Sequence, residues 1–548
     1  MRRMHILAGA MILSAGAAWA DLPFDVVALA GKQVPGLAMN ENYSLFTYAT
    51  GNASGQIGLG ALASGVSITF SNDGVVLAGD RNALELIARE GDPAPVTGGD
   101  LYQFTSAPSL TSDGTAVFRS TLNPSGFGFF SHAPGSATKL LSRDGGPVDN
   151  TSTVLLGTTV FGNRYAVDDS GGAYAISNLQ GSAVTAGDQY AIIRTSDTST
   201  TTVARTGITL PPGEAVGVVY DSFVFVNANA AGQVAFEAML RNMPADQDVG
   251  YWVRGGGSIF LVTRESKHAP GLPAAVTFGQ MGSAIGIGDD GTVAFCALLA
   301  GTGVTSDNDS SLWAGKPGAL KLIAREGDAA PELDPGVVFD DFLYASTVDI
   351  APAVSSKGRV AFLARVRGPG ITDTNNDGLW VQDGDGVLRL VLREGTLIPS
   401  GNNMNQGIGN STALISPFTL DPIASFKNPL KLLFSAETGN GSFDGVYEAD
   451  VPPPTFDTIR PTVKIRGPAK RSTKARRIRL LGNATDNTAV ARVEYRIGRG
   501  GIRIALGTTN WRLKAKLKIG RNSILVRSVD TAGNTSPFAR VKIRRLRS

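Results

Sequence analysis

The chain of 548 residues contains 67 glycines, one cysteine and 18% charged residues, and its formal net charge is +3. The single cysteine, Cys296, excludes a fold held together by intramolecular disulfides, so stability must come from the burial of apolar surface. A chain of this length can bury several cores, and its glycine content suits many short strands joined by tight turns.

The first 20 residues predict a secretory signal peptide. A basic start (residues 1–3) leads into an apolar stretch (6–17) and a small-x-small cleavage site (18–20). This apolar stretch is short for a membrane span, and no later one approaches the roughly 20 residues that a membrane helix needs. We therefore expect a mature protein beginning at Asp21 that is secreted or held at the cell surface, with no transmembrane span.

A repeat begins after this segment. A turn containing glycine is followed four positions later by an apolar anchor residue, and the last copy lacks the glycine. The seven anchors are Leu59, Phe118, Ile176, Phe236, Phe295, Phe362 and Phe434. They are 59, 58, 60, 59, 67 and 72 residues apart, so the repeated unit is about 60 residues long.

Two further markers recur in phase with the anchors. An apolar strand that closes on Arg-Glu-Gly ends at residues 89–91, 325–327 and 393–395, with degenerate copies at 143–145, 205–207 and 264–266. A Gly-aromatic strand lies between the anchor and this marker, as at 250–252, 378–380 and 445–447. Each unit therefore predicts three or four short strands separated by tight turns.

These units predict a seven-bladed β-propeller over residues 21–450, because small sheets at a regular period bury their faces by stacking around an axis. The last unit has no Arg-Glu-Gly strand after residue 448, whereas the mature N-terminus supplies an extra strand in that register at 26–31. We expect this first strand to complete the last blade. An open β-solenoid is the alternative, although its coils are usually shorter.

The two phased motifs resemble a bacterial tandem-repeat family of exported proteins described by an Asn-x-x-Gly-x-x-Ala-Phe repeat, whose members carry variable C-terminal surface anchors. The resemblance covers residues 24–450. It implies an exported repeat protein and carries no agreed activity.

The character of the chain changes after a proline-rich linker at residues 451–459. Residues 460–548 contain 24 Lys and Arg against 3 acids, a net charge of +21, which leaves −18 for the preceding part. Alternating apolar and basic residues, as at 513–518, predict half-buried strands with basic outer faces. Seven such strands in under 90 residues predict a β-sandwich. The stretches 482–487 and 529–536 resemble bacterial immunoglobulin-like surface modules, which implies a spacer, adhesion or anchoring role.

A run of charge is most often a solvated face, but the concentration of positive charge in residues 460–548 predicts an anionic surface polymer as their partner. The candidates are lipopolysaccharide, acidic polysaccharide, extracellular DNA and the acidic repeat region of the protein itself. Any such interaction should strengthen at low salt.

One stretch suggests a metal site. Asp373, Asn375 and Asp377 place oxygens at alternate positions before Gly378, as in a calcium-binding loop, but Gly384 stands where a bidentate glutamate is expected. Related acidic turns in other units favour a repeated turn in which Asx side chains hold the backbone. Calcium at these three residues is the one cofactor hypothesis.

No residue is assigned a catalytic or cofactor-binding role. The Arg-Glu pairs recur in several units, which predicts structural ion pairs between strand and turn or between blades. The glycines at 286–291 match a dinucleotide pattern by spacing, but a strand follows them. His132 and His268 are too few for a histidine-rich metal site, and alternation predicts that Cys296 packs on the face opposite Phe295.

We therefore expect a non-enzymatic exported binding or scaffold protein whose propeller loops bind an extracellular glycan or protein. The alternative is a propeller hydrolase or lyase that acts on extracellular polysaccharide. An enzyme should gather acids or bases that do not follow the repeat, and the period-breaking stretches 302–310 and 368–377 are the places to look. The acids whose placement decides this question are Asp340, Asp341, Asp373 and Asp377.

Overall fold

The computed structural model describes residues 24–52, 54–95, 98–124, 126–160, 165–342, 351–398, 406–407, 414–415, 430–437, 443–451, 460–467, 470–486, 490–498, 500–530 and 534–547. The chain divides into two compact units, unit 1 (Met1–Pro453) and unit 2 (Pro454–Ser548). The division falls within the predicted linker. Most of that linker, and the predicted signal peptide, lie outside the described residues. The protein is all-β: the long regular elements described are strands, and none is a helix able to cross a membrane.

Among the described residues, unit 1 contains seven antiparallel sheets of four or five strands, numbered here in chain order. The first contains β2 (Asn42–Gly51), β3 (Gln56–Ser64), β4 (Gly74–Asp80) and β5 (Ala83–Arg89). The second contains β6 (Leu101–Thr105), β7 (Ser109–Leu110), β8 (Ala116–Asn123), β9 (Phe127–His132) and β10 (Lys139–Arg143). The third contains β11 (Leu155–Val160), β12 (Ala166–Val167), β13 (Ala173–Gln180), β14 (Tyr190–Thr195) and β15 (Thr200–Arg205).

The fourth sheet contains β16 (Val219–Ala228), β17 (Val234–Arg241), β18 (Val249–Gly255) and β19 (Ser258–Arg264). The fifth contains β20 (Val276–Ile287), β21 (Val293–Gly301), β22 (Ser310–Gly315) and β23 (Lys321–Arg325). The sixth contains β24 (Val338–Asp341), β25 (Ala353–Val354), β26 (Val360–Arg367), β27 (Asp377–Gln382) and β28 (Leu388–Arg393). A two-stranded sheet of β29 (Leu397–Ile398) and β30 (Gln406–Gly407) follows.

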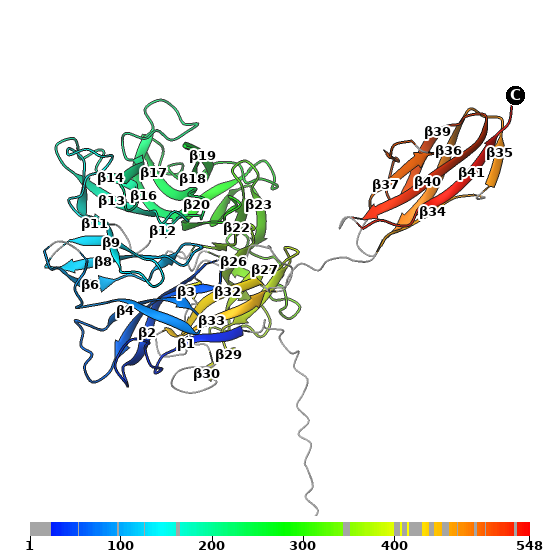
Figure 1. The fold of residues 1–548 in the computed structure, drawn as a ribbon. Helices are drawn as coiled ribbons and strands as arrows, with labels where there is room; N and C mark the ends of the chain where they lie inside the picture. Colours follow the sequence, from blue (N-terminus) through cyan, green and yellow to red (C-terminus); the bar gives the residue numbers. More distant parts are fainter. Residues whose placement is uncertain are drawn as a thin grey trace, which may run out of the picture. The chain divides into compact units, whose positions relative to one another are not determined.

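The seventh sheet joins the two ends of unit 1. It contains β31 (Leu414–Ile415), β32 (Leu430–Glu437), β33 (Phe443–Val451) and β1 (Phe24–Leu29). β1 runs antiparallel to β33 in a register that pairs Val26 with Tyr447, and Figure 1 shows the blue β1 beside the yellow β33. The prediction that the first strand completes the last repeat is confirmed.

An apolar pair lies at the centre of each sheet. In the register of each sheet, the repeat anchor lies directly opposite a large apolar residue of the next strand. The pairs are Leu59 with Leu77, Phe118 with Phe130, Ile176 with Ile192, Phe236 with Trp252, Phe295 with Trp313, Phe362 with Trp380 and Phe434 with Tyr447. The anchor and Gly-aromatic markers of the sequence are therefore the two halves of one contact.

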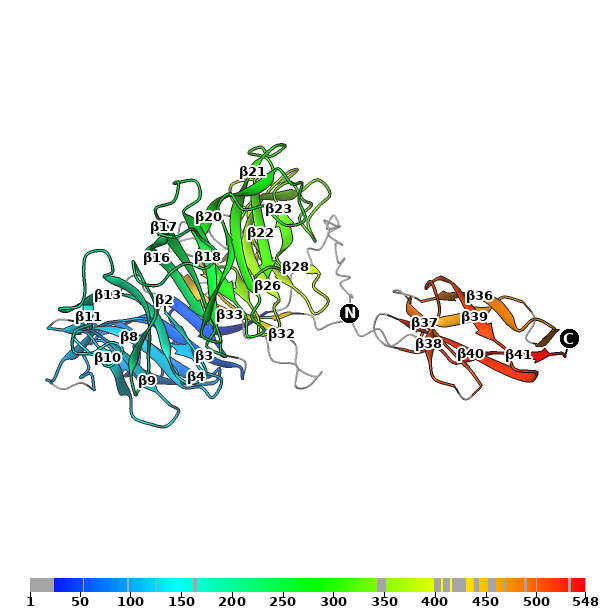
Figure 2. The same ribbon diagram turned by 90° about the horizontal axis from the view of Figure 1, so that it is seen from above.

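Neighbouring sheets pack face to face through shared cores. Six apolar clusters each combine residues of two successive sheets, beginning with the seventh and first and ending with the fifth and sixth. The opening strands of successive sheets also contact one another, from β2 and β7 through β12 and β16 to β20 and β25. Figure 2 shows this succession from a second side. The small sheets therefore bury their faces against one another, as the repeat requires.

Unit 2 is built from two sheets around one core. A three-stranded sheet contains β34 (Thr462–Ile465), β36 (Arg477–Thr485) and β39 (Asn510–Lys516). A five-stranded sheet contains β35 (Lys470–Thr473), β41 (Ala539–Arg545), β40 (Gly520–Asp530), β37 (Val490–Ile497) and β38 (Arg503–Ile504). Leu480, Trp511 and Ile524 belong to the core between them. Buried and exposed residues alternate strictly along β39, which confirms the predicted basic outer face of that strand.

The contact between β1 and the rest of unit 1 is testable through Ala28. Its side chain is 8% exposed and belongs to the core shared by the seventh and first sheets. Ala28→Asp should lower the free energy of unfolding of unit 1 by about 3 kcal/mol, because an unpaired carboxylate would enter an apolar core. Urea denaturation of the mature chain measures the change. Lys32→Ala, on the exposed turn after β1, should have little effect, and equal effects of the two substitutions would contradict the pairing.

Candidate functional site

A repeated polar turn connects the second and third long strands in four sheets of unit 1. Its sequence is Gly-x-x-Val/Ile-Thr-x-x-Asn/Asp, at residues 65–72, 181–188, 301–308 and 368–375. In each copy the backbone N–H of the threonine donates to the side-chain oxygen of the final Asn or Asp, over 2.7–3.0 Å. Such Asx contacts hold the backbone in a turn. The stretches 302–310 and 368–377, predicted to break the period, are therefore largely copies of a repeated element.

The Arg-Glu motif, at the end of the last strand of a sheet, forms hydrogen bonds with this turn. The arginine Nε donates to the backbone carbonyl of the last turn residue in three sheets, as Arg89 does to Asn72 (2.9 Å) and Arg325 to Asn308 (2.6 Å). The following glutamate accepts from the N–H at the start of the third strand, as Glu90 does from Gly74 (3.2 Å). The predicted ion pairs occur at Arg205 with Asp188, between strand and turn, and at Glu326 with Arg367, between sheets, whereas the contacts that recur are hydrogen bonds to the backbone.

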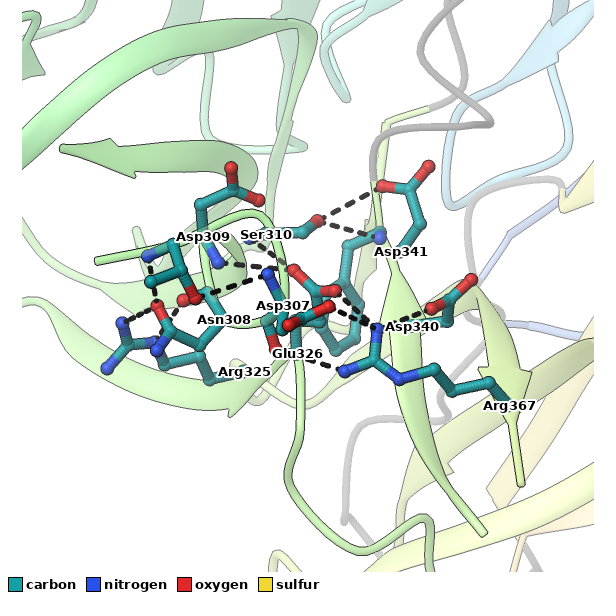
Figure 3. A network of polar contacts seen from close by, with 11 residues as sticks. Asp307, Asn308, Asp309, Ser310, Arg325, Glu326, Asp340, Asp341 and Arg367 are labelled. Carbon is teal, nitrogen blue, oxygen red and sulfur yellow. Dashed lines mark hydrogen bonds and ion pairs between the residues drawn. The ribbon is translucent and has the colours of Figure 1, made fainter. Parts of the chain in front are cut away.

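Between the fifth and sixth sheets the repeated contacts extend into a larger network (Figure 3). Glu326 follows β23, and its Oε2 accepts from the N–H groups of Asp309 (3.1 Å) and Ser310 (3.3 Å). Its Oε1 lies 2.7 Å from Nη1 of Arg367, which comes from β26 of the sixth sheet. The same Nη1 lies 2.7 Å from Oδ1 of Asp340 on β24. One guanidinium thus joins the carboxylates of two sheets.

A second connection joins the same two sheets. The hydroxyl of Ser310, at the start of β22, donates to Oδ1 of Asp341 (3.1 Å) and accepts from the N–H of Phe342 (2.9 Å). Ser310 is buried, so these bonds are shielded from water. Asp340 and Asp341 therefore lie in one network but have different partners.

The electrostatics of the network follow from burial. Burial raises the pKa of Glu326 above its ordinary value, and the Arg367 guanidinium offsets this effect only in part. The hydrogen bond to Asp340 raises the pKa of Arg367. Arg367 thus compensates a buried carboxylate that the backbone contacts hold in place. The carboxylate of Asp307 is largely exposed beside it, 4.0 Å from the guanidinium.

The three predicted calcium ligands have different contacts. Asp373 is exposed in the repeated turn, and the side-chain oxygen of Asn375 accepts from the N–H of Thr372 (2.8 Å). Oδ1 of Asp377 lies 3.2 Å from Nε of Arg365. No group of three or more His, Cys, Asp or Glu side chains is placed to hold a metal ion within the described ranges. The calcium hypothesis stays a prediction, and the alternative of an Asx turn accounts for Asn375.

Cys296 and His132 occupy buried packing positions, and His268 is exposed. Cys296 is buried in a cluster on the opposite face of β21 from Phe295, as predicted, and burial raises the pKa of its thiol. His132 is buried with Nδ1 3.0 Å from Oγ1 of Thr138, and Nε2 of His268 lies 3.1 Å from the carbonyl of Leu272.

Two features were missed at the sequence level. The Gly-x-x-Val/Ile-Thr-x-x-Asn/Asp turn is visible in the sequence as a repeat, and the invariant spacing of Thr and Asn was the signal that would have found it. Arg367 stands five residues after the anchor Phe362, as Arg241 does after Phe236, so the sequence contains part of its signal; its contact with Glu326 of another sheet has no such signal.

These features define an all-β protein of repeated small antiparallel sheets whose strand ends are held by a recurring polar turn. The chain belongs to a family of unknown function, DUF7453, whose model matches residues 15–419. No curated protein matches it.

Two solved structures align weakly with the chain. Fibronectin(III)-like modules of Clostridium thermocellum CbhA share 17% identity, with a TM-score of 0.15, over 38% of this chain and 94% of theirs. An engineered GH43 glycoside hydrolase with endo-xylanase and exo-arabinofuranosidase activity shares 11% identity, with a TM-score of 0.20, over 91% and 90% of the two chains. At these scores neither alignment carries an argument about fold or activity.

The network between the fifth and sixth sheets is testable through Arg367. Arg367→Ala should lower the free energy of unfolding by about 1–2 kcal/mol at pH 8, because it leaves Glu326 without a counter-charge. The loss of unfolding free energy should become smaller as the pH falls, because a protonated Glu326 carries no charge for the guanidinium to compensate. Chemical denaturation at pH 5 and pH 8 measures both effects. Lys321→Ala, an exposed change on β23, is the control, and a loss independent of pH would contradict the electrostatic role.

Glu90 predicts a pH dependence. Burial, with a contribution from Asp73, raises its pKa to about 7. A carboxyl whose pKa is raised on folding stabilises the fold below its unfolded value, and this contribution is lost as the pH rises to about 7. Glu90→Gln should therefore retain its thermal stability better than the wild type between pH 5 and pH 8. Asp80→Asn, an exposed change on β4, should leave the pH dependence unaltered, and parallel curves for all three proteins would contradict the assignment.

Proposed function

We propose that the chain is an exported binding or scaffold protein. Unit 1 is a seven-bladed β-propeller that presents loops to an extracellular glycan or protein, and unit 2 is an immunoglobulin-like β-sandwich that attaches the protein to an anionic surface. The signal-peptide pattern at residues 1–20 supports export to the cell surface or beyond. The phased repeat supports membership of the exported Asn-x-x-Gly-x-x-Ala-Phe proteins.

The propeller assignment is supported by the pairing of β1 with β33. A strand from the beginning of the repeat region completes the sheet at its end, which is how a circular array of sheets joins its first and last members. The serial contacts between the opening strands support the same arrangement, because the innermost strands of a propeller surround its axis.

The binding role is supported by the way polar contacts follow the repeat. The Thr-x-x-Asn/Asp turn recurs in four sheets with the same hydrogen bond, and the Arg-Glu motif recurs around it. A catalytic group is needed once, whereas these polar side chains serve the same backbone contacts several times. This observation carries the preference for a scaffold over an enzyme.

The network around Arg367 favours a second candidate function. Its Arg367–Asp340 ion pair recurs in the fourth sheet as Arg241 with Asp221, but among the described residues only this copy adds Glu326 and the exposed carboxylate of Asp307 beside the guanidinium. Paired carboxylates are the usual acid and base of glycoside hydrolysis. A polysaccharide hydrolase or lyase therefore remains the alternative.

A glycan array tests the two candidates. The mature chain should bind anionic ligands in a salt-dependent manner through residues 460–548, and a variant without these residues should retain only ligands bound by unit 1. Binding that is insensitive to salt would contradict the anionic attachment. Release of reducing or unsaturated sugars from a bound polysaccharide, abolished by Asp307→Asn or Asp340→Asn, would contradict the scaffold role and support the enzyme.

A further inference from the structure

The three-stranded sheet of unit 2 carries an outer surface that we call the basic face. Its charged residues lie on or next to β34, β36 and β39, and their side chains are exposed. They are Lys464, Arg466, Arg477, Arg479, Arg512, Lys514 and Lys516. The proposed function assigns anionic attachment to unit 2 as a whole, whereas the register of these strands allows a particular face and ligand to be argued.

Like charges face each other directly across the strands of the basic face. Arg477 pairs with Lys516, and Arg479 pairs with Lys514. Side chains that lie opposite each other in an antiparallel pair are roughly 5 Å apart at their Cβ atoms, and like charges there destabilise the sheet. Two consecutive repulsive pairs therefore weaken the sheet when no anion is bound.

The acids of unit 2 do not compensate this face. Residues 460–548 contain only Asp486, Glu494 and Asp530. Glu494 is on the five-stranded sheet, 2.8 Å from both Arg492 and Arg527, and Asp530 is buried at the end of β40. Asp486 follows the end of β36. The ion pairs of Glu494 therefore lie on the five-stranded sheet.

Exposed leucines flank the cations in one row of this face. Arg512 pairs with Leu481 on one side and bridges to Leu506 on the other, so the three side chains share the outer surface. Leu481 is 43% exposed and Leu506 is 61% exposed. An apolar group beside lysines and arginines is typical of proteins that bind the interface of a membrane.

Aromatic platforms are absent from the described basic face. Residues 460–548 contain three aromatic residues, of which Trp511 and Tyr495 are buried. Phe538 lies under the guanidinium of Arg527 on the five-stranded sheet. Proteins that bind single-stranded nucleic acids usually stack bases on exposed aromatic rings. Leucines in place of aromatic rings favour a lipid surface over such a polymer.

We propose that the basic face binds the surface of an anionic lipid bilayer. Phosphate oxygens of the headgroups accept hydrogen bonds from the arginines and lysines and relieve the repulsion between the paired strands. Leu481 and Leu506 enter the boundary between headgroups and acyl chains. This inference rests on the proposed anionic attachment and specifies its site and its ligand.

Co-sedimentation with vesicles tests the proposal. The mature full-length protein should bind vesicles of phosphatidylglycerol and phosphatidylcholine at low salt and bind pure phosphatidylcholine vesicles at least about tenfold more weakly. Arg479→Gln/Lys514→Gln should weaken binding about tenfold or more and raise the melting temperature of unit 2, because it removes a repulsive pair. A loss of binding with a higher melting temperature cannot be attributed to misfolding.

The matched control is Arg521→Gln/Arg544→Gln. These arginines form a directly opposed pair on the five-stranded sheet, so the change in charge and in repulsion is the same on the other face of the unit. The control should retain most of the vesicle binding. Equal losses in the two variants would overturn the assignment to the basic face.

The variant Leu481→Ser/Leu506→Ser distinguishes binding to lipid from binding to other polyanions. It should weaken vesicle binding several-fold and leave binding to heparin unchanged. Vesicle binding unaffected by this variant, or binding to heparin without binding to vesicles, would overturn the lipid proposal and retain the anionic attachment. Failure to bind both would overturn that attachment as well. Self-association at low salt in sedimentation velocity, without vesicle binding, would assign the basic face to the acidic unit 1 of a second copy.

Discussion

The pairing of an anchor residue with an aromatic or aliphatic residue on the neighbouring strand is the contact on which unit 1 depends. Phe236 and Trp252 stack with their ring centroids 6.0 Å apart, and Phe362 and Trp380 do so at 6.2 Å. Each pair fixes the register of two strands and also supplies the surface against which another sheet packs. A four-stranded sheet cannot bury both faces by itself. Each sheet therefore depends on the neighbouring sheet to cover its apolar pair.

This dependence explains why the sequence predicted the architecture better than the site. Anchors such as Phe118 and Phe295 recur because every sheet has to fill the same position, and a constraint repeated seven times is visible in a single sequence. The pairing of β1 with β33 was predictable for the same reason, since the repeat was one strand short at one end and one strand long at the other. A contact that occurs once produces no repeated pattern in the sequence. Arg367 and Glu326 are 41 residues apart and meet only because the fifth and sixth sheets are neighbours.

The calcium pattern illustrates the opposite case. Asp373, Asn375 and Asp377 have the spacing of ion ligands, but the same spacing also serves a turn that has to satisfy its own backbone. Asn375 and its counterpart Asn308 accept from a threonine N–H three residues earlier, and an oxygen engaged in this way holds the loop without an ion. Recurrence across sheets, more than the motif itself, distinguishes the two explanations.

The pairing of β1 with β33 also constrains the order of assembly. Val26 and its partner Tyr447 are more than 400 residues apart in the chain, so a protein made from its N-terminus produces β1 first and its partner strand among the last of unit 1. Until then β1 is an unpaired strand, and the edge of β33 stays open once it is made. Contacts of such long range form slowly, and unpaired edges invite association with other chains. The final step in building unit 1 therefore joins the oldest segment of the chain to one of the newest, and the interval before that step is when the protein is most exposed to aggregation.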